Sequence, residues 1–325
     1  MDFKLDQLPA QTGKIAIVTG ANTGLGYETA VHLAQKGIKV IMACRSQDKA
    51  IQAKSAIESK VPGAELDILL IDLTDLAAVR TFAAAFRAQY DRLDFLINNA
   101  GIMFPPYTQT VDGFESQMGA NYFGHFLLTA LLLDRMPDTL ESRVVSLSSN
   151  AHKAAANGIN FDDLQSEKQY SKMGAYAQSK LACLMFGNQL QRRLAQAGKQ
   201  VRSVTAHPGV SETELARHMP QYQIQLIRYT IGAFIAHPPE QASLPTVMAA
   251  LDPAAQGGEY FGPQGWLEMT GKPGRAQPSH AAQDPVAAAK LWTLSEQLTE
   301  KRFRSDTPIY DLSALRKIIL SSPAW

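Results

Sequence analysis

A tyrosine and a lysine that lie four residues apart, Tyr176 and Lys180, could together perform acid–base chemistry. Residues at this spacing share one face of a helix, so the phenol and the ammonium group would lie close together. A nearby cation favours the phenolate form of tyrosine, which would make Tyr176 a usable general acid or base near neutral pH. Such a pair is common by chance, and an exposed helix pair without a role is the simpler interpretation. Support for the chemistry must come from the rest of the chain.

A glycine-rich segment over residues 19–26 has the spacing and the setting of a turn that binds phosphate groups. It follows an apolar run and precedes a helical pattern, which places it at a helix N-terminus where backbone N–H groups bind anions. Its three glycines suit a tight turn, a close approach of the backbone to a pyrophosphate, and close packing of the helix on the strand. We expect a dinucleotide-binding turn made of Gly20, Asn22, Thr23, Gly24, Leu25 and Gly26. The alternative is a glycine-rich turn that binds no ligand.

The next apolar run ends in Arg45 and Ser46, which indicate the kind of dinucleotide. NAD sites usually have an acidic residue here for the ribose 2′-hydroxyl, whereas an arginine suits the 2′-phosphate of NADP. No carboxylate lies between Gly37 and Gln47. Arg45 can hold a phosphate through two parallel hydrogen bonds, with Ser46 as a secondary donor. We therefore expect NADP(H) as the cofactor, the alternative being a solvated arginine at a strand end.

Two later strand ends contain residues that suit the adenosine part of such a cofactor. Asp72 can accept a hydrogen bond from the adenine amino group, with the backbone of Leu73 beside it. The segment Asn99, Ala100 and Gly101 follows the fourth apolar run, and its small residues leave room for the adenosine ribose.

Short apolar runs alternate with helical patterns over the first two thirds of the chain. The runs cover residues 15–19, 40–44, 66–73, 95–97, 144–147 and 201–206. Runs that are apolar on both faces are typical of a parallel sheet with helices on both sides. The alternation predicts a single α/β domain with a doubly wound parallel sheet of Rossmann type and right-handed crossovers. Ligands then bind at the C-terminal ends of the strands.

The chain after Pro208 is expected to complete the site. An apolar helical stretch at about 210–237 predicts substrate-lid helices over an apolar pocket, although these side chains could also simply pack on the sheet. The α/β domain with its lid then covers residues 13–262, and residues 263–325 form a C-terminal extension. The expected later elements are a helix over 240–251, a strand over 258–262, a surface loop over 263–285, a helix over 286–298 and a tail over 306–325 that contains one more short helix.

Composition narrows the classes of protein that the chain can belong to. With 31 Lys and Arg against 30 Asp and Glu, the net charge is +1, and 46% of the residues are hydrophobic. Neither disorder nor nucleic-acid binding is indicated. The two cysteines make no disulfide framework, and no group of residues has metal-ligand spacing, so no metal is expected. Without a signal-like N-terminus or a run of about 18 apolar residues, we expect no transmembrane segment and a cytoplasmic location.

The motifs occur in the order found in the short-chain dehydrogenases/reductases, and the chain resembles that family over about residues 13–262. The ordered features are the glycine turn, the Asn-Asn-Ala-Gly run, a serine after the fifth strand, the tyrosine–lysine helix and a Pro-Gly pair after the sixth strand. In that family the serine orients the substrate, the tyrosine transfers the proton, the lysine assists the tyrosine and holds the nicotinamide ribose, and an asparagine supports a water relay. The resemblance assigns these roles to Ser149, Tyr176, Lys180 and Asn121. Ser149 is preferred to Ser148 because it matches the second serine of the family's pair.

The resemblance also places the nicotinamide beside the Pro-Gly pair. The residues expected there are Pro208 and Gly209, with Val210 and Thr213 near the carboxamide. Because Tyr176 already fills the acid–base role, the nearby histidines are interpreted as packing or hydrogen-bonding residues. They are His125, His152 and His207.

Within the family, the chain looks like the retinol dehydrogenase branch. The motifs that carry this likeness are Asn22–Gly26, Ala43–Arg45, Asp163–Gln165 and Ser179–Ala182. Members typically use NADP(H) and reduce retinal-like or other apolar aldehydes and ketones. We therefore expect an NADP(H)-dependent oxidoreductase that interconverts a small apolar carbonyl compound and its alcohol, with a homo-oligomer left open.

Two alternative functions are kept. Protochlorophyllide reductases share much of the pattern but carry a cysteine two residues after the lysine, where this chain has Ala182, with Cys183 one residue later. A catalytically silent protein that senses NADP(H) is the other alternative, and the complete set of four catalytic candidates disfavours it.

Overall fold

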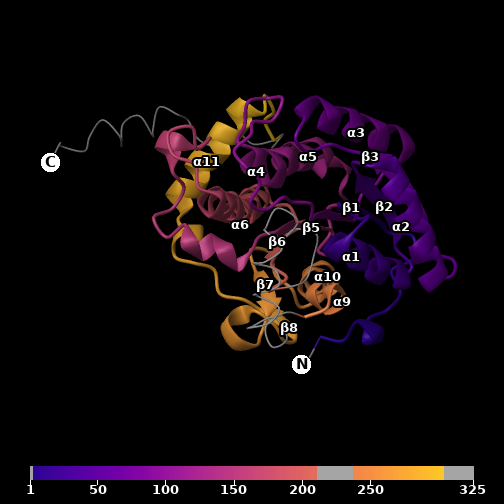
Figure 1. Ribbon diagram of the computed structural model, residues 1–325. Coiled ribbons are helices and arrows are strands. Elements are labelled where there is room, and N and C mark those ends of the chain that lie inside the picture. The colour runs from indigo at the N-terminus through magenta and orange to yellow at the C-terminus, as the bar shows by residue number, and fades with distance from the viewer. Residues whose placement is uncertain (1–2, 211–236, 304–325) are drawn as a thin grey trace.

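An eight-stranded sheet forms the centre of the molecule in the computed structural model, which describes residues 3–210 and 237–303 (Figure 1). The strands are β1 Ile15–Thr19, β2 Lys39–Cys44, β3 Leu66–Leu70, β4 Phe95–Asn98, β5 Arg143–Leu147, β6 Arg202–Ala206, β7 Tyr260–Pro263 and β8 Pro273–Arg275. Their spatial order is β3-β2-β1-β4-β5-β6-β7-β8, and all neighbours are parallel except β7 and β8. Because the winding direction reverses between β1 and β4, a ligand crevice is expected at the carboxyl ends of these two strands.

The sheet separates two apolar cores, since successive side chains of a strand point to opposite faces. In β1, Ile17 packs into one core, whereas Ala16 and Val18 pack into the other. Both faces of the strand are therefore buried, which explains why the predicted strands read as continuous apolar runs.

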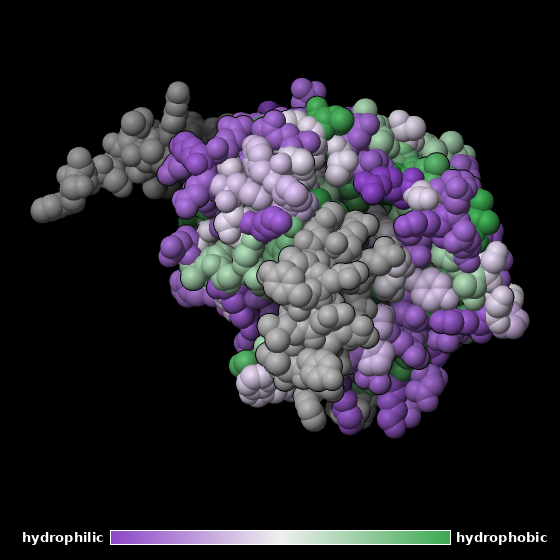
Figure 2. Space-filling model, in the orientation of Figure 1, coloured by the Kyte–Doolittle hydropathy of each residue, from purple (hydrophilic) through white to green (hydrophobic). Residues whose placement is uncertain are grey.

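Helices cover both faces of the sheet (Figure 1). On one face lie α1 Gly24–Gln35, α2 Gln47–Lys60, α9 Pro239–Ala242 and α10 Leu244–Leu251. On the other lie α3 Leu76–Gln89, α4 Ser116–Met118, α5 Gly124–Leu132, α6 Lys172–Gln196 and α11 Pro285–Leu298, the last packed against α6. No helix in the described part of the chain is both long enough and apolar enough to cross a membrane. On the face drawn in Figure 2, hydrophilic residues dominate the described surface.

The fold class predicted from the sequence is confirmed, and the differences concern the end of one strand, the division of one helix and one additional strand. The run over 66–73 is a strand only to Leu70, because its sole neighbour β2 ends at Cys44, whose carbonyl accepts the last bond from Ile71 N–H at 3.0 Å. The single helix expected over 240–251 is wrong. It divides into α9 and α10, with Pro245 in the first turn of α10, where the ring suits a helix start.

The sequence does not predict β8. Residues 273–275 contain a proline and a glycine and show no alternation, and they form a strand only because they pair antiparallel with β7. The sheet thus continues past residue 262, where the sequence places the start of the C-terminal extension. The expected lid over 211–236, with Thr213, and the expected tail helix lie outside the described residues.

Candidate active site

A cavity of about 440 Å³ opens at the carboxyl ends of β1, β2, β3 and β4, and it includes the point where the winding reverses. It brings together most of the residues that the sequence assigns to the dinucleotide. Its lining includes Gly20, Asn22, Thr23, Gly24, Leu25, Gly26, Arg45, Ser46, Asp72, Leu73, Asn99, Ala100 and Gly101. Residues from four separate strand ends therefore share one crevice, as the parallel sheet requires.

The turn after β1 has a backbone that only glycines allow. Gly20 and Gly24 have φ angles of 69° and 54°, in the left-handed region that favours glycine. A Cβ atom on Gly26 would lie 2.3 Å from the carbonyl oxygen of Gly20, so a side chain there would clash with backbone. No side chain caps the N-terminus of α1. Its first N–H groups are thus available to an anion in the cavity.

A buried hydrogen-bond network joins this turn to the segment after β4. The hydroxyl of Thr19 accepts hydrogen bonds from the N–H groups of Asn99 and Ala100, both at 2.9 Å. His125 donates from Nδ1 to the carbonyl of Asn121 at 2.9 Å, so its Nε2 accepts from the Thr19 hydroxyl, also at 2.9 Å. Burial lowers the pKa of His125 to about 4, which keeps the ring neutral. Asn99 also donates from Nδ2 to the carbonyl of Thr19 at 2.8 Å, which ties the two strand ends together.

The adenosine end of the cavity has two exposed cations, Arg45 and Lys49, and one partly engaged carboxylate. Arg45 is exposed at the end of β2, and its side chain makes no ion pair with any residue that the structure describes. Ser46 caps α2 by accepting from Lys49 N–H at 3.4 Å. Asp72 accepts from the N–H and the hydroxyl of Thr74, and both bonds go to Oδ1. Its Oδ2 is left to face a donor in the cavity.

Tyr176 and Lys180 lie in α6, each only 5% exposed. The ammonium nitrogen of Lys180 is 5.7 Å from the centre of the Tyr176 ring and donates to the carbonyl of Leu147 at 3.1 Å. This bond anchors the lysine at the carboxyl end of β5. The pair is therefore buried beside the cavity rather than exposed to solvent, which excludes the simpler interpretation of a solvated helix pair.

Asn121 lies in a π-helical segment, Gly119–Phe123, between α4 and α5. Its side chain spans two elements, because Nδ2 donates to Ser179 Oγ at 2.9 Å and Oδ1 accepts from Ile102 N–H at 2.8 Å. A Cβ on Gly101 would lie 3.2 Å from Asn121 Oδ1 and 3.4 Å from Lys180 Nζ, so the two side chains meet beside that glycine.

The two serines after β5 have different environments. Ser148 is buried, and its hydroxyl donates to the carbonyl of Lys180 at 2.7 Å. Ser149 is half-buried, and its hydroxyl accepts from Ala151 N–H at 3.2 Å while keeping its own proton. His152 donates from Nδ1 to the Ser149 carbonyl at 2.6 Å and is fully buried. Of the two serines, only Ser149 has a hydroxyl proton to offer to a substrate.

The segment after β6 passes close to the same serine turn. Gly209 has a φ angle of 73°, and a Cβ there would lie 2.1 Å from the carbonyl oxygen of Met269. Pro208 accepts a hydrogen bond on its carbonyl from His237 Nε2 at 2.8 Å, and Val210 is 39% exposed. Thr213 lies outside the described residues.

Two features of the site have no signal in the sequence. Phe104 has a φ angle of 60° and its ring lies edge-on to Tyr176, with ring centres 5.4 Å apart. The loop around Glu268, between β7 and β8, joins the serine turn through side-chain hydrogen bonds. Both depend on contacts between segments distant in sequence, so no local pattern could reveal them.

The three histidines interpreted from the sequence as packing or hydrogen-bonding residues, His125, His152 and His207, all make hydrogen bonds inside the fold. Burial lowers the pKa of His207 to about 3, and its Nδ1 accepts from Gly209 N–H at 3.3 Å. Burial also lowers the pKa of His152, whose Nε2 accepts from Ser279 N–H at 3.1 Å. These rings are neutral hydrogen-bonding groups inside the fold.

Comparison with known proteins gives consistent matches. Residues 14–223 match the family model described as short chain dehydrogenase. Human retinol dehydrogenase 13 is 40% identical over 292 residues, which cover 88% of this chain and 84% of that protein. The crystal structure of an uncharacterized protein from Mycobacterium Paratuberculosis is 39% identical with a TM-score of 0.76, and the match covers 94% of this chain and 100% of that one. The complex of Pseudomonas aeruginosa RhlG with NADP shares the fold at 23% identity and a TM-score of 0.62, over 77% of this chain and 94% of that one.

Proposed function

The chain belongs to the short-chain dehydrogenase family, in its retinol dehydrogenase-like branch, and from this premise we propose that it is an NADP(H)-dependent oxidoreductase for an apolar aldehyde or ketone and its alcohol. One observation carries the proposal. Tyr176 and Lys180 are buried together at the carboxyl edge of the sheet, and Lys180 Nζ lies beside Gly101, which lines a cavity that has the features of a dinucleotide site. Fold alone would not imply chemistry, whereas a phenol and an ammonium group placed in this way can transfer a proton.

The residues around the cavity fit NADP(H). The uncapped first turn of α1 suits the pyrophosphate, since it offers N–H groups and the positive end of the helix dipole. Arg45 would hold the 2′-phosphate, and Asp72 would accept from the adenine amino group through Oδ2. Lys180 would contact the nicotinamide ribose. When bound, the cofactor would supply the hydride for reduction or accept it during oxidation.

The catalytic side chains divide the remaining work. The hydroxyl of Ser149 donates a hydrogen bond to the substrate oxygen and orients it. The hydroxyl of Tyr176 gives its proton to that oxygen during reduction, and takes one back during oxidation. The charge of Lys180 stabilises the phenolate that remains, in a buried setting where such an interaction is stronger than in water. Asn121 holds the backbone of Ile102 beside the lysine and is proposed to support a water relay.

The apolar substrate class is proposed from the name of the related human enzyme and from the apolar residues after β6, most of which lie outside the described part of the chain. Val210, which is described, presents an exposed apolar side chain at this position.

The experiment that tests the proposal replaces the phenol of Tyr176 by a plain ring. Purified wild-type protein and Tyr176→Phe are assayed for NADPH oxidation with a panel of linear and aromatic aldehydes. We expect kcat to fall by about 10²–10⁴ in the variant, with NADPH binding retained. Tyr90→Phe is the matched control, because it also removes one phenol hydroxyl, which bonds to Asp67, and neither residue lines the cavity. Near-normal turnover of Tyr176→Phe would refute the proposed mechanism.

The same panel separates an enzyme from a silent sensor. If wild-type protein bound NADPH but oxidised it with no aldehyde or ketone, and formed no NADPH from NADP with any alcohol, the sensing function would replace the catalytic one.

A further inference from the structure

The loop between β7 and β8 holds two large apolar side chains in solvent beside the candidate active site. Trp266 is 68% exposed and Leu267 is 61% exposed. The base of the loop is closed by a hydrogen bond from Gly265 N–H to the carbonyl of Thr270 at 2.7 Å. The surface drawn in Figure 2 is mostly hydrophilic, so two adjacent exposed apolar side chains call for an explanation.

The backbone of this loop is held in a conformation that side chains disfavour. Leu267 and Glu268 have φ angles of 49° and 55°, so two successive residues other than glycine are left-handed. A Cβ atom makes this region unfavourable, and such strain persists only where the surroundings enforce it. Strained positions of this kind concentrate at functional sites.

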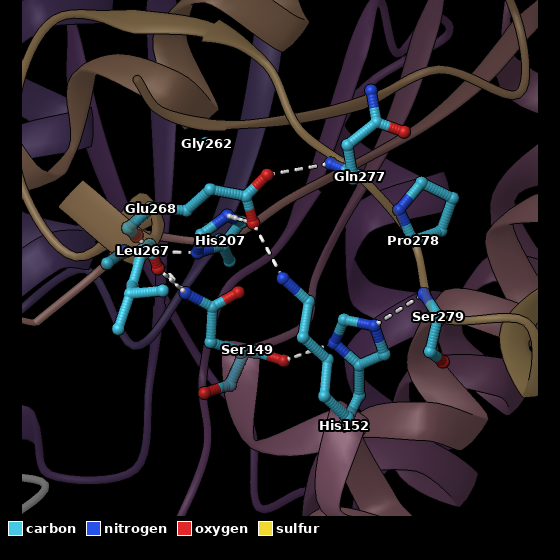
Figure 3. A network of polar contacts seen from close by, with 12 residues as sticks. Ser149, His152, His207, Gly262, Leu267, Glu268, Gln277, Pro278 and Ser279 are labelled. Carbon is cyan, nitrogen blue, oxygen red and sulfur yellow. Dashed lines mark hydrogen bonds and ion pairs between the residues drawn. The ribbon is translucent and has the colours of Figure 1, made fainter. Parts of the chain in front are cut away.

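A set of polar contacts enforces the conformation (Figure 3). The carboxylate of Glu268 accepts from Lys153 Nζ at 2.9 Å and from Gln277 N–H at 2.8 Å. Asn150 donates from Nδ2 to the carbonyls of Leu267 and Glu268, at 3.2 and 3.1 Å. Burial alone would raise the pKa of Glu268. The hydrogen bonds from Lys153 and from Gln277 N–H, together with the Lys153 charge, hold that pKa below the usual range. The backbone of the loop is therefore held in place, with the side chains of Trp266 and Leu267 on its exposed side.

The fixed loop lies between the two segments that define the reaction centre. Asn150 directly follows Ser149, the proposed substrate-orienting residue. On the other side, Val210 N–H donates to the carbonyl of Met269 at 2.8 Å, which joins the loop to the segment proposed for the nicotinamide. In Figure 3 the side chain of Leu267 and that of Ser149 lie on the same side of the network.

We propose that Leu267, with Trp266 beside it, forms a fixed apolar wall of the substrate site and determines the preference for carbonyl compounds with a long aliphatic chain. The proposal rests on the proposed function, since it concerns the substrate of that site. Glu268 is a positioning residue that holds the wall through Lys153. An aliphatic chain lying against two preplaced apolar side chains loses water contact without any cost of ordering the loop.

Kinetics with a series of aldehydes provide the first test. We compare propanal, hexanal and decanal with wild-type protein, Leu267→Ala and the control Val286→Ala, which shortens another highly exposed apolar side chain, on α11. We expect Leu267→Ala to lower kcat/KM for decanal by roughly 10-fold and for propanal by less than 2-fold, because only the long chain reaches the wall. Val286→Ala should change neither. Equal losses for all three aldehydes, or no loss, would overturn the proposal.

The positioning role of Glu268 has a distinct kinetic signature. Glu268→Gln keeps the shape of the side chain but removes the ion pair with Lys153. We expect KM for decanal to rise several-fold with kcat for propanal unchanged, since the reaction centre itself is intact. An unchanged KM for decanal would refute the anchoring role.

A binding measurement separates this proposal from the proposed function. We titrate 1-decanol into Tyr176→Phe without cofactor and follow tryptophan fluorescence. Covering Trp266 should shift the emission to shorter wavelength, and adding Trp266→Phe to Tyr176→Phe should abolish the shift. If the shift occurred but the wild-type protein reduced no carbonyl compound, the proposed function would be rejected and the wall supported. Normal turnover of decanal with no such shift would reject the wall while leaving the function standing.

Discussion

Removal of the Arg45 side chain is predicted to reduce the preference for NADPH over NADH. The guanidinium is exposed at the end of β2, lines the cavity and has no ion-pair partner within the described ranges 3–210 and 237–303. Asp72, the one carboxylate in the described cavity lining, is occupied on one oxygen by Thr74. The 2′-phosphate of NADPH would therefore meet a free cation, whereas the 2′-hydroxyl of NADH would gain nothing from it.

The magnitude follows from the exposure of the group. Two unit charges about 4 Å apart attract by about 1 kcal/mol in water, and a ribose phosphate carries nearly two negative charges near neutral pH. Because Arg45 is exposed, the value for water is the appropriate one, which gives about 2 kcal/mol. This corresponds to a roughly 30-fold weaker binding of NADPH in Arg45→Ala. Binding of NADH should change by less than 2-fold.

The assay is a titration of both cofactors against wild-type protein and Arg45→Ala at low and at high salt. The wild-type affinity for NADPH should weaken with salt more steeply than that of the variant, since screening acts on the missing charge. Lys54→Ala serves as the control, because it also removes a cation, from the middle of α2, where Lys54 is half-buried and pairs with Glu58 and neither residue lines the cavity. An unchanged ratio of NADPH to NADH affinity in Arg45→Ala would refute the assignment of the 2′-phosphate to this residue.

Three further predictions concern the glycine turn, a buried histidine and the serine pair. Gly26→Ala should lower Tm and abolish NADPH binding, measured by thermal unfolding and titration, because its Cβ would lie 2.3 Å from the Gly20 carbonyl oxygen. The folded pKa of His125 is about 4 against an ordinary 6.5, so the unfolded chain binds more protons between these values. The contribution of His125 to the free energy of unfolding, at most ~3 kcal/mol, should therefore be present above pH 6.5 and be lost as the pH falls to 4. In denaturant titrations at a series of pH values, a His125→Asn variant should lack this part of the pH dependence of the free energy of unfolding. Ser149→Ala should lower kcat/KM with little change in stability. Ser148→Ala should lower the free energy of unfolding by about 1 kcal/mol, because only Ser148 loses a buried hydrogen bond to a backbone carbonyl. If Ser148→Ala lowered kcat/KM and Ser149→Ala lowered stability, the two assigned roles would be exchanged.

The parallel sheet and the ends of its strands could be predicted because they rest on local patterns. Runs that are apolar on both faces identify strands buried between helices, and the spacing from Gly20 to Gly26 identifies the turn at the start of α1. Once the strands are known to be parallel, their carboxyl ends must share one edge. That rule alone brings Arg45, Asp72 and Asn99 to one cavity.

The burial of the Tyr176 and Lys180 side chains could not be predicted in this way. The four-residue spacing of Tyr176 and Lys180 places them on one helix face but leaves open whether that face meets the sheet or the solvent. The deciding contact is the bond from Lys180 Nζ to the carbonyl of Leu147, 33 residues away in sequence. Similarly, β8 exists only through its pairing with β7, because a segment containing Pro273 and Gly274 has little strand preference of its own.

The loop after β7 shows the limit of sequence reasoning most clearly, and also how structure adds to it. Glycine or asparagine is the ordinary residue at left-handed positions, so a chain selected only to fold would have one of them at residues 267 and 268. Here the positions are occupied by a leucine and a glutamate, and their conformation is enforced by Asn150 and Lys153 from more than 100 residues earlier. For Glu268 the strain is compensated, because its carboxylate anchors the loop through hydrogen bonds from Lys153 and Gln277. The side chain of Leu267 makes no comparable contact and is 61% exposed. Within the described fold, no interaction of this side chain therefore compensates for the backbone strain at residue 267. A ligand with an apolar surface, bound next to Ser149, would provide a stabilising contact for this side chain.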